Sequence, residues 1–383
     1  MPELHLELLD RFDDYARIEH VWKNLSAESD CSYFLSWGWV QNWIETLPRE
    51  VSVKLAVLAN GTGPRSAFFL GHANMVKQRV FRSKAYLVNQ TGNWDYDRLY
   101  IEHNSVLQSS REACSLQQIV DNLPGDWEEL YLSALAPSSF LANDLNIAPP
   151  YEVMIANVMP SPFVDLQMVR AKSGGHLALL RSSVRSQIKR AYRLYEAKGP
   201  LVCEVASDLP QALEIYAELI ELHEAWWQQR KKPGAFHSQY FRAFHRRLIE
   251  KRFSTGEIQL IRVRCGGVTV GCLYNFVFRG VVYFYQSGLA SEEDNRMKPG
   301  YLCHVEAVEH CAKAGYLRYD FLAGFEDYKE RLSTDQRPVV WARVQKPKIK
   351  FKVERVLREA AQKGVAWYRD RKRGKPRSVE IPA

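Results

Sequence analysis

Three residues in the second half of the chain have side chains suited to proton transfer: His223, Asp320 and Lys329. Histidine titrates near neutral pH, so His223 is the best single candidate for a general base. Asp320 stands in the apolar run YDFL, where a carboxylate must be hydrogen-bonded, paired with a cation or raised in pKa. Lys329 is expected either to pair with Asp320 or to hold a carboxylate or phosphate of a bound molecule. Each residue also has a purely structural explanation as a satisfied core group, and the sequence leaves both interpretations open.

The backbone offers a second kind of chemistry at Pro299 and Gly300. A β-branched and aromatic run at 281–286 predicts a strand, and a polar loop follows at 287–298. Proline in the first turn and Gly315 at the end predict a helix from Pro299 to about Ala314. The first N–H groups of a helix lack partners within it and favour a phosphate or carboxylate. The alternative is an ordinary helix start without a ligand.

A row of basic residues lies on a third predicted feature, a long amphipathic helix that ends at Gly199 and Pro200. Its apolar residues recur at steps of three and four, and the basic residues recur every four positions on another face. The row consists of Arg181, Arg185, Lys189 and Arg193. It is either a solvated face or a surface for phosphate groups of a bound molecule.

These candidates must be positioned by strands and helices that the patterns predict. His223 lies on a helix that Ser207 or Asp208 caps, with Trp227 one turn further on. Two strands, 258–264 and 268–278, flank a Gly266–Gly267 turn, which is a strong hairpin signal. The strand at 281–286 is therefore the third of a meander, and 319–322 is a further strand that carries Asp320.

The first 165 residues give a second set of mixed elements without a comparable helix start. Helices are predicted at 8–25 and 110–123, and strands at 51–59, 66–75, 96–102, 127–133 and 151–158. Residues 80–92 are basic and then polar, with no element assigned. The segment MPSPFVDL, 159–166, contains two prolines and is the predicted domain boundary. We therefore expect domains at 1–165 and 166–345, followed by a tail at 346–383.

Composition indicates a globular, ordered chain of 383 residues, too long for one ordinary domain. No apolar run is long enough to span a membrane, and the N-terminus lacks the pattern of a signal peptide. The seven cysteines have no metal-binding spacing, so we expect reduced core residues, no metal and a cytoplasmic protein.

The net charge of +8 is concentrated in the tail, where residues 346–383 carry 13 Lys and Arg but 4 Asp and Glu. The other residues are about neutral, which argues against a nucleic-acid-binding body. The tail is predicted to form a basic amphipathic helix. It is either a packing helix or an attachment to an anionic membrane surface, which would place the protein peripherally at the inner membrane face, or to RNA.

Four short motifs together resemble the C-terminal half of the CelD-like acetyltransferases. These form a branch of the GNAT superfamily close to the FemAB-type peptidyltransferases. The motifs are YQSG at 285–288, PG at 299–300, DFL-G at 320–324 and YK at 328–329. The resemblance implies an α/β (α+β) fold with tandem GNAT-like domains, the first degenerate and the second catalytic. Each would have a mixed, mostly antiparallel sheet flanked by helices.

The resemblance also implies roles for particular residues. A cleft between two diverging parallel strands would hold acyl-CoA as co-substrate. The residues implied in binding it are Tyr285, Gln286, Ser287, Gly288, Pro299, Gly300, Tyr301 and Leu302. His223, Asp320 and Lys329 would be catalytic. Glu326, Tyr328, Arg185 and Lys189 would contact the acceptor.

The function implied is an acyl-CoA-dependent N-acyltransferase, acting on an amine of a small metabolite, an amino sugar or an envelope polysaccharide precursor. The family's link to exopolysaccharide production is the reason for the last of these. Two alternatives stay open: a FemAB-type transferase that moves an aminoacyl group from tRNA to a peptidoglycan precursor, and a non-catalytic binding protein that keeps the fold. The first is less favoured, because no long heptad arm follows residue 208.

Overall fold

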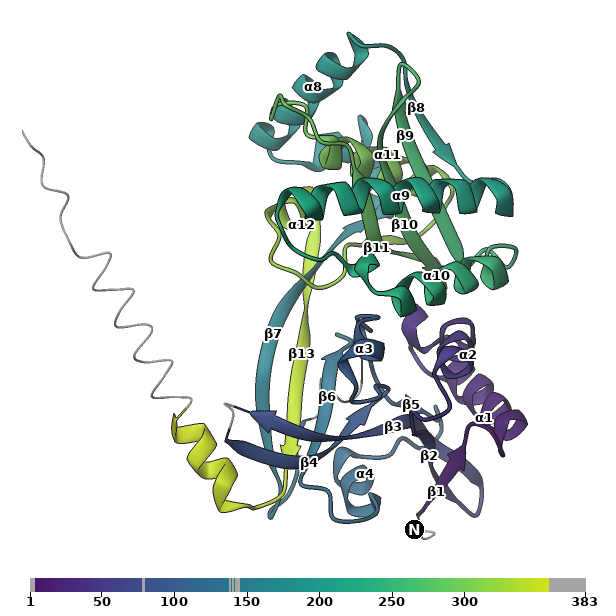
Figure 1. Cartoon of the computed structure of the whole chain (residues 1–383), viewed down its shortest axis with the longest axis vertical. Helices are drawn as coiled ribbons and strands as arrows, with labels where there is room; N and C mark the ends of the chain where they lie inside the picture. Colours follow the sequence, from purple (N-terminus) through teal and green to yellow (C-terminus); the bar gives the residue numbers. More distant parts are fainter. Residues whose placement is uncertain (1–3, 78–79, 138, 140, 142–144, 358–383) are drawn as a thin grey trace, which may run out of the picture.

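The computed structural model describes residues 4–77, 80–137, 139, 141 and 145–357. Across these residues one continuous sheet of 13 strands runs through the whole molecule (Figure 1). Its order is β1-β2-β3-β4-β6-β13-β7-β12-β11-β10-β9-β8, and β5 (Leu107–Gln108) pairs with β3 off this path. Helices cover both faces of the sheet in its C-terminal half.

The strand order repeats from each end towards the centre, as expected for two related halves. The N-terminal half contributes β1 (His5–Asp10), β2 (Val53–Asn60), β3 (Gly63–Lys77), β4 (Phe81–Val88) and β6 (Glu129–Leu135). The C-terminal half contributes β8 (Leu201–Val205), β9 (Ile258–Cys265), β10 (Val268–Phe278), β11 (Val281–Leu289) and β12 (Arg318–Asp320). In both halves four antiparallel strands lead to one parallel pair, β4 with β6 and β11 with β12.

Two long strands join the halves at the centre of the sheet. β7 (Glu152–Asp165) follows the N-terminal half but pairs with β12, and β13 (Asp335–Gln345) follows the C-terminal half but pairs with β6. β7 and β13 also pair with each other along their length. β7 therefore runs through the predicted boundary at 159–166, and the division at residue 165 stays a prediction.

The helices bury their apolar stripes against this sheet in separate clusters. One cluster packs α1, α2, α9 and α10 against one face, and another packs α8 and α11 against the opposite face of the C-terminal half. The bounds are α1 Tyr15–Glu28, α2 Trp37–Thr46, α3 Trp94–Asp97, α4 Leu116–Asn122, α6 Leu166–Ala171, α7 Gly175–Leu179, α8 Ser182–Glu196, α9 Leu209–Gln229, α10 Gln239–Arg252, α11 Pro299–Lys313 and α12 Asp327–Leu332, with 3-10 turns at Tyr33–Leu35 and Ala235–His237. No described helix is both long and apolar enough to cross a bilayer.

In the N-terminal half one predicted helix starts later than expected, one predicted strand was wrong and one strand was not predicted. The helix expected from residue 8 is preceded by β1, whose pairing with β2 outweighs the local helical pattern. The strand expected at 96–102 is instead the short helix α3 followed by irregular backbone with Tyr100 at a positive φ of 46°. Residues 81–88 form β4, which the basic side chains on its exposed positions had concealed. Of the predicted tail, residues 346–348 are irregular, residues 349–357 are helical, and residues 358–383 lie outside the described residues.

Candidate active site

A cleft opens where the parallel strands β11 and β12 diverge. They pair only over Val281–Tyr283 and Arg318–Asp320. Next along β11, Asn275 of β10 lies opposite Phe284 while Tyr274 lies opposite Gln286, so Tyr285 is an extra residue that makes a β-bulge. A bulge bends and twists its strand, so it turns β11 away from β12. The resulting cleft has a volume of about 800 Å³ and is lined mainly by residues of the C-terminal half.

The glycine of the YQSG motif allows helix α9 to approach β11. A Cβ atom at Gly288 would collide with the carbonyl oxygen of Leu219 and lie 2.9 Å from the Cβ of Leu222. Tyr285 points its ring into the core, where its hydroxyl donates to the carbonyl of Leu99 at 2.6 Å. The neighbouring Gln286 and Ser287 line the cleft. The motif thus positions the wall of the cleft as well as forming part of it.

The start of α11 presents one backbone amide to the cleft. Lys298 takes a left-handed conformation with φ of 49°, and its carbonyl accepts from the amides of Tyr301 at 3.0 Å and Leu302 at 3.3 Å. Pro299 has no N–H, and the amide of Gly300 has no partner among the described residues. Leu302 is fully buried and does not line the cleft. Of the four residues expected to offer amides here, Gly300 alone has a free N–H.

His223 lines the cleft in a state that suits hydrogen-bond donation better than proton acceptance. Its Nε2 accepts from the indole N–H of Trp227 at 2.9 Å, so the neutral ring carries its proton on Nδ1. Nδ1 is buried and has no partner among the described residues. Burial lowers the pKa of His223 to about 4. With its one lone pair occupied by Trp227, the ring does not favour the predicted role of general base.

Lys329 lies buried in the wall of the cleft, although its partner is not the predicted one. Its Nζ donates to the carbonyl of Ala323 at 2.9 Å and lies 3.5 Å from Oε2 of Glu326. A Cβ atom at Gly324 would collide with the Glu326 carboxylate and lie 2.7 Å from Nζ of Lys329. The glycine of the DFL-G motif therefore leaves room for this pair. Glu326 and Lys329 both line the cleft, as expected.

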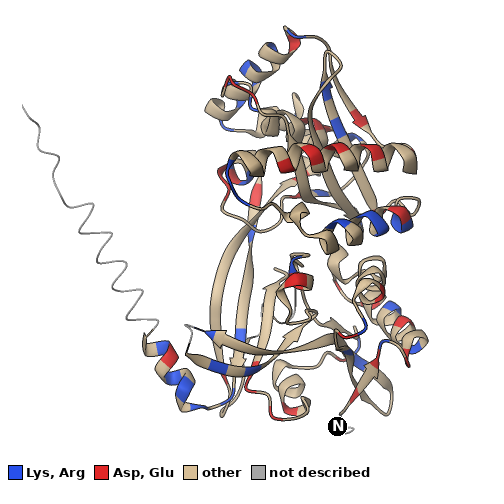
Figure 2. Ribbon diagram, viewed as in Figure 1, with Lys and Arg blue, Asp and Glu red and all other residues tan. Residues whose placement is uncertain are grey.

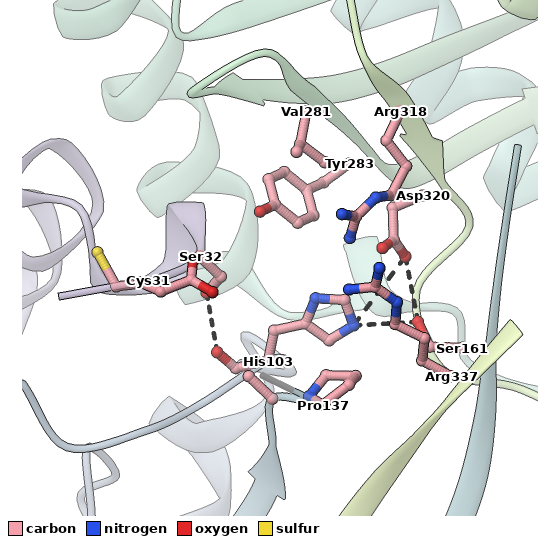
Figure 3. A pocket seen from close by; sticks show the side chains of 12 residues that line it. Cys31, Ser32, His103, Pro137, Ser161, Val281, Tyr283, Arg318, Asp320 and Arg337 are labelled. Carbon is pink, nitrogen blue, oxygen red and sulfur yellow. Dashed lines mark hydrogen bonds and ion pairs between the residues drawn. The ribbon is translucent and has the colours of Figure 1, made fainter. Parts of the chain in front are cut away.

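Asp320 faces a different, smaller cavity and does not line the cleft. Its Oδ1 accepts from Oγ of Ser161 at 3.1 Å and from the amide of Leu322 at 2.9 Å (Figure 3). Alternation along β12 explains this placement, because Tyr319 and Phe321 point to the opposite face of the sheet from Asp320. The predicted pairing of Asp320 with Lys329 is not formed.

Glu102, which the sequence did not single out, lines the cleft from the N-terminal half. Its carboxylate accepts a hydrogen bond from the amide of Ala323, at the end of β12. Burial raises the pKa of Glu102 to about 7, and the nearby ammonium of Lys329 opposes part of this rise. The segment YIEHN begins within the strand predicted at 96–102 and carries no motif, so the sequence contains no signal for this role.

Comparison with known protein families shows which family has a similar sequence in this region. Residues 182–330, which include the cleft's strands and α11, match the family described as Acetyltransferase (GNAT) domain. Within these residues the chain is similar to the acetyltransferases of the GNAT superfamily. No curated protein sequence matches the chain significantly.

Solved structures share the fold over nearly the whole chain. A C-terminal domain assigned to a lysylphosphatidylglycerol synthetase of Agrobacterium fabrum superposes with a TM-score of 0.52 at 13% identity, covering 89% of this chain and 95% of that one. FemX superposes with a TM-score of 0.51 at 8% identity, covering 89% and 97%. A tandem GNAT protein from the clavulanic acid pathway gives a TM-score of 0.43 at 13% identity, covering 89% and 98%, and carries no weight here. At these identities the likeness concerns the fold alone.

Of the remaining residues expected to contact the acceptor, some line the cleft and others do not. Tyr328 lines the cleft, and its ring stacks on His304 with centroids 5.3 Å apart. Arg185 and Lys189 lie on α8 and do not line the cleft. Figure 2 shows basic residues along α8 and α10 and acidic residues along α9. Within the described ranges, no three His, Cys, Asp or Glu side chains group as metal ligands.

Proposed function

We propose that this protein transfers an acyl group from acyl-CoA to an amine, which belongs to a small metabolite, an amino sugar or an envelope polysaccharide precursor. One observation carries the proposal: the unpaired edge of β11 and the carboxylate of Glu102 face the same cleft. The first is a surface that can bind an extended amide-bearing donor. The second is a proton acceptor at the place where an amine would react.

The donor side of the cleft is supported by groups that lack protein partners. β12 ends at Asp320, so the edge of β11 from Phe284 onward has no strand beside it. Free backbone groups on a strand edge suit the two amides of a pantetheine arm. The open amide of Gly300 at the start of α11 suits an anionic oxygen. The Nδ1–H of His223 is a further unpaired donor in the same wall.

The acceptor amine is protonated at neutral pH and must lose a proton before it can attack a carbonyl carbon. A carboxylate with a pKa of about 7 is unprotonated in about half of the molecules at that pH and is matched to this task. The hydrogen bond from Ala323 fixes the orientation of Glu102. We assign the role of general base to Glu102, and the role of a positioning cation to Lys329.

Aromatic rings support an acceptor with a sugar-like or otherwise flat apolar face. Tyr100 and Trp226 both line the cleft and are 47% and 40% exposed, which is unusual for rings of this size. Trp94 lies beside Tyr100, with ring centroids 6.3 Å apart. Exposed rings with a polar edge are typical of surfaces that bind amphipathic ligands.

The proposal includes a cytoplasmic location, which the seven free cysteines support. It also includes contact with an anionic membrane surface. The helical segment 349–357 exposes Ile349, Val353, Val356 and Leu357 at helical spacing, and Lys348 and Lys352 lie among them. A face of this composition suits the boundary between lipid headgroups and acyl chains.

The test is a donor screen on the purified full chain by native mass spectrometry and calorimetry. Acetyl-CoA and longer acyl-CoAs are compared with free CoA, and product formation is then followed with panels of amines that include amino sugars. We expect retention of an acyl-CoA and release of free CoA only when an amine is added. Failure of every acyl-CoA to bind, together with RNA that co-purifies, would support a FemAB-type donor instead.

A further inference from the structure

A second polar site is built into the centre of the sheet by strand register. Tyr283 of β11 lies opposite Asp320 of β12, which lies opposite Phe163 of β7. Two residues further along these strands, Arg318 lies on the same side as Asp320, and Arg337 of β13 lies opposite Ser161. Residues two apart on a strand share a face, so these side chains converge. They line a cavity of about 80 Å³, which His103 covers from the N-terminal half (Figure 3).

Three hydrogen-bond donors face this cavity without an acceptor of their own. The guanidinium groups of Arg318 and Arg337 both point into it (Figure 3) and lie over the ring of Phe163, at 5.0 Å and 5.2 Å. Within the described part of the chain, neither arginine makes an ion pair within 4.0 Å or a hydrogen bond. The hydroxyl of Tyr283 likewise has no partner there. The two guanidinium charges face one buried carboxylate in the cavity, that of Asp320, so together these three groups leave one positive charge in excess.

The acidic side of the cavity is already engaged. Ser161 Oγ donates to Asp320, so the proton between His103 Nε2 and Ser161 Oγ, 3.0 Å apart, belongs to the histidine. In this row of hydrogen bonds Ser161 lies between His103 and Asp320. In the catalytic triad of a hydrolase the histidine lies between the serine and the aspartate, so this row is not such a triad. Asp30 also lines the cavity and, like Arg337, is exposed. The hydrogen bonds that join His103, Ser161 and Asp320 therefore stabilise the cavity wall and do not involve the two arginine side chains.

We propose that this cavity binds a small oxyanion, a carboxylate or phosphoryl group, between Arg318 and Arg337 with the Tyr283 hydroxyl as a third donor. The planar guanidinium fork matches both kinds of anion. The cavity holds several times the volume that one water molecule requires and excludes bulky ligands from its interior. The site is separate from the acyl cleft, because Asp320 lies on this cavity while Leu322 and Ala323 line the cleft.

The test measures anion binding to the full chain by calorimetry in a chloride buffer. Inorganic phosphate, methyl phosphate and acetate are the probes, so that a free phosphate, a phosphate ester and a carboxylate are distinguished. We expect at least one probe to bind at millimolar concentration or tighter. Arg337→Gln should weaken that binding about tenfold or more, and Tyr283→Phe, which removes one hydroxyl, about tenfold or less.

Arg331→Gln is the matched control, because Arg331 is exposed on α12 and pairs with Asp327 outside the cavity. Among the described residues the side chain of Arg337 makes no ion pair or hydrogen bond, and its contact with the Phe163 ring is at an exposed position, so we expect Arg337→Gln to fold, which thermal unfolding checks. Acyl-CoA affinity should be unchanged in Arg337→Gln, so this site and the proposed transfer reaction fail or succeed independently. Absence of binding by every probe, or equal binding by the wild type and Arg337→Gln, would overturn the proposal.

Discussion

Glu102 accepts a hydrogen bond from the backbone amide of Ala323, so a carboxylate from the N-terminal half is held at the end of β12 in the GNAT domain. The carbonyl of Ala323 also accepts a hydrogen bond from Lys329. One residue therefore orients both Glu102 and Lys329. The proposed active site therefore needs both halves of the chain. The predictions below follow from this arrangement.

Replacement of Glu102 by Gln should lower kcat by about 10²- to 10⁴-fold, the usual contribution of a general base. The amide keeps the shape of the side chain and can still accept from Ala323, so acyl-CoA affinity should change little. Steady-state kinetics and calorimetry separate the two effects. Glu250→Gln, an exposed carboxylate on α10 that pairs with Arg246, is the control and should retain full activity. A Glu102→Gln enzyme with normal kcat would remove this residue from the mechanism.

The pH dependence of kcat should follow the ionisation of Glu102. A base acts only when unprotonated, and the pKa of this carboxyl is raised to about 7 by burial. Activity should therefore fall as the pH drops through about 7, and reach a plateau above it. Lys329→Met removes the ammonium that lowers the pKa of Glu102, so the acid limb should move to higher pH. A limb near pH 4.5, the ordinary value for glutamate, would contradict the assignment.

Replacement of Gly324 by Ala should impair catalysis more than folding. The new methyl group collides with the mobile ends of Glu326 and Lys329, which can move aside, and not with backbone. We expect kcat/KM to fall while the melting temperature changes little. Thermal unfolding measured beside kinetics makes the distinction. A large loss of stability with normal specific activity would show that the glycine serves packing alone.

Replacement of Gly288 by Ala should impair folding stability more than catalysis. Its methyl group meets the carbonyl oxygen of Leu219, so helix α9 must shift as a body. Overpacking of this kind costs about 1–3 kcal/mol in the free energy of unfolding. Chemical denaturation measures this loss. Gly61→Ala is the comparison, because a Cβ atom there meets nothing within 4 Å and the loss should be close to zero.

Replacement of His223 by Ala should weaken acyl-CoA binding without abolishing the pH profile. Trp227 occupies Nε2 of His223, and Nδ1–H is buried beside Gly234 without a partner among the described residues, so the ring can donate to a bound molecule that reaches Nδ1 but has no free lone pair. Loss of one such hydrogen bond corresponds to about tenfold in affinity. Calorimetry gives the affinity, and kcat against pH should keep its limb near 7. If that limb vanished, His223 and not Glu102 would be the base.

Local patterns predicted most strands and helices of the C-terminal half, although β13 was not among them. The Gly-Gly hairpin, the proline at the start of α11 and the glycine at its end are each decided by neighbours in sequence, and the structure has β9, β10 and α11 in those places. The motifs YQSG, PG, DFL-G and YK also indicated the superfamily, which the comparison confirms. In the N-terminal half the patterns were weaker, and β1 and β4 are stabilised by pairing partners distant in the chain.

The residues that face one another were decided only by tertiary structure. Asp320 and Phe321 are neighbours in sequence, yet the alternation of side chains along the strand places them on different faces of the sheet. The carboxylate that the sequence favoured as catalytic therefore does not line the cleft. Glu102 lines the cleft because the two halves share one sheet and the segment before β5 packs against the end of β12. Strand order and register are set by contacts between segments far apart in sequence, and no local pattern encodes them. The sequence by itself indicated the GNAT superfamily and most strands and helices of the C-terminal half, while the folded chain decided which acid lines the cleft.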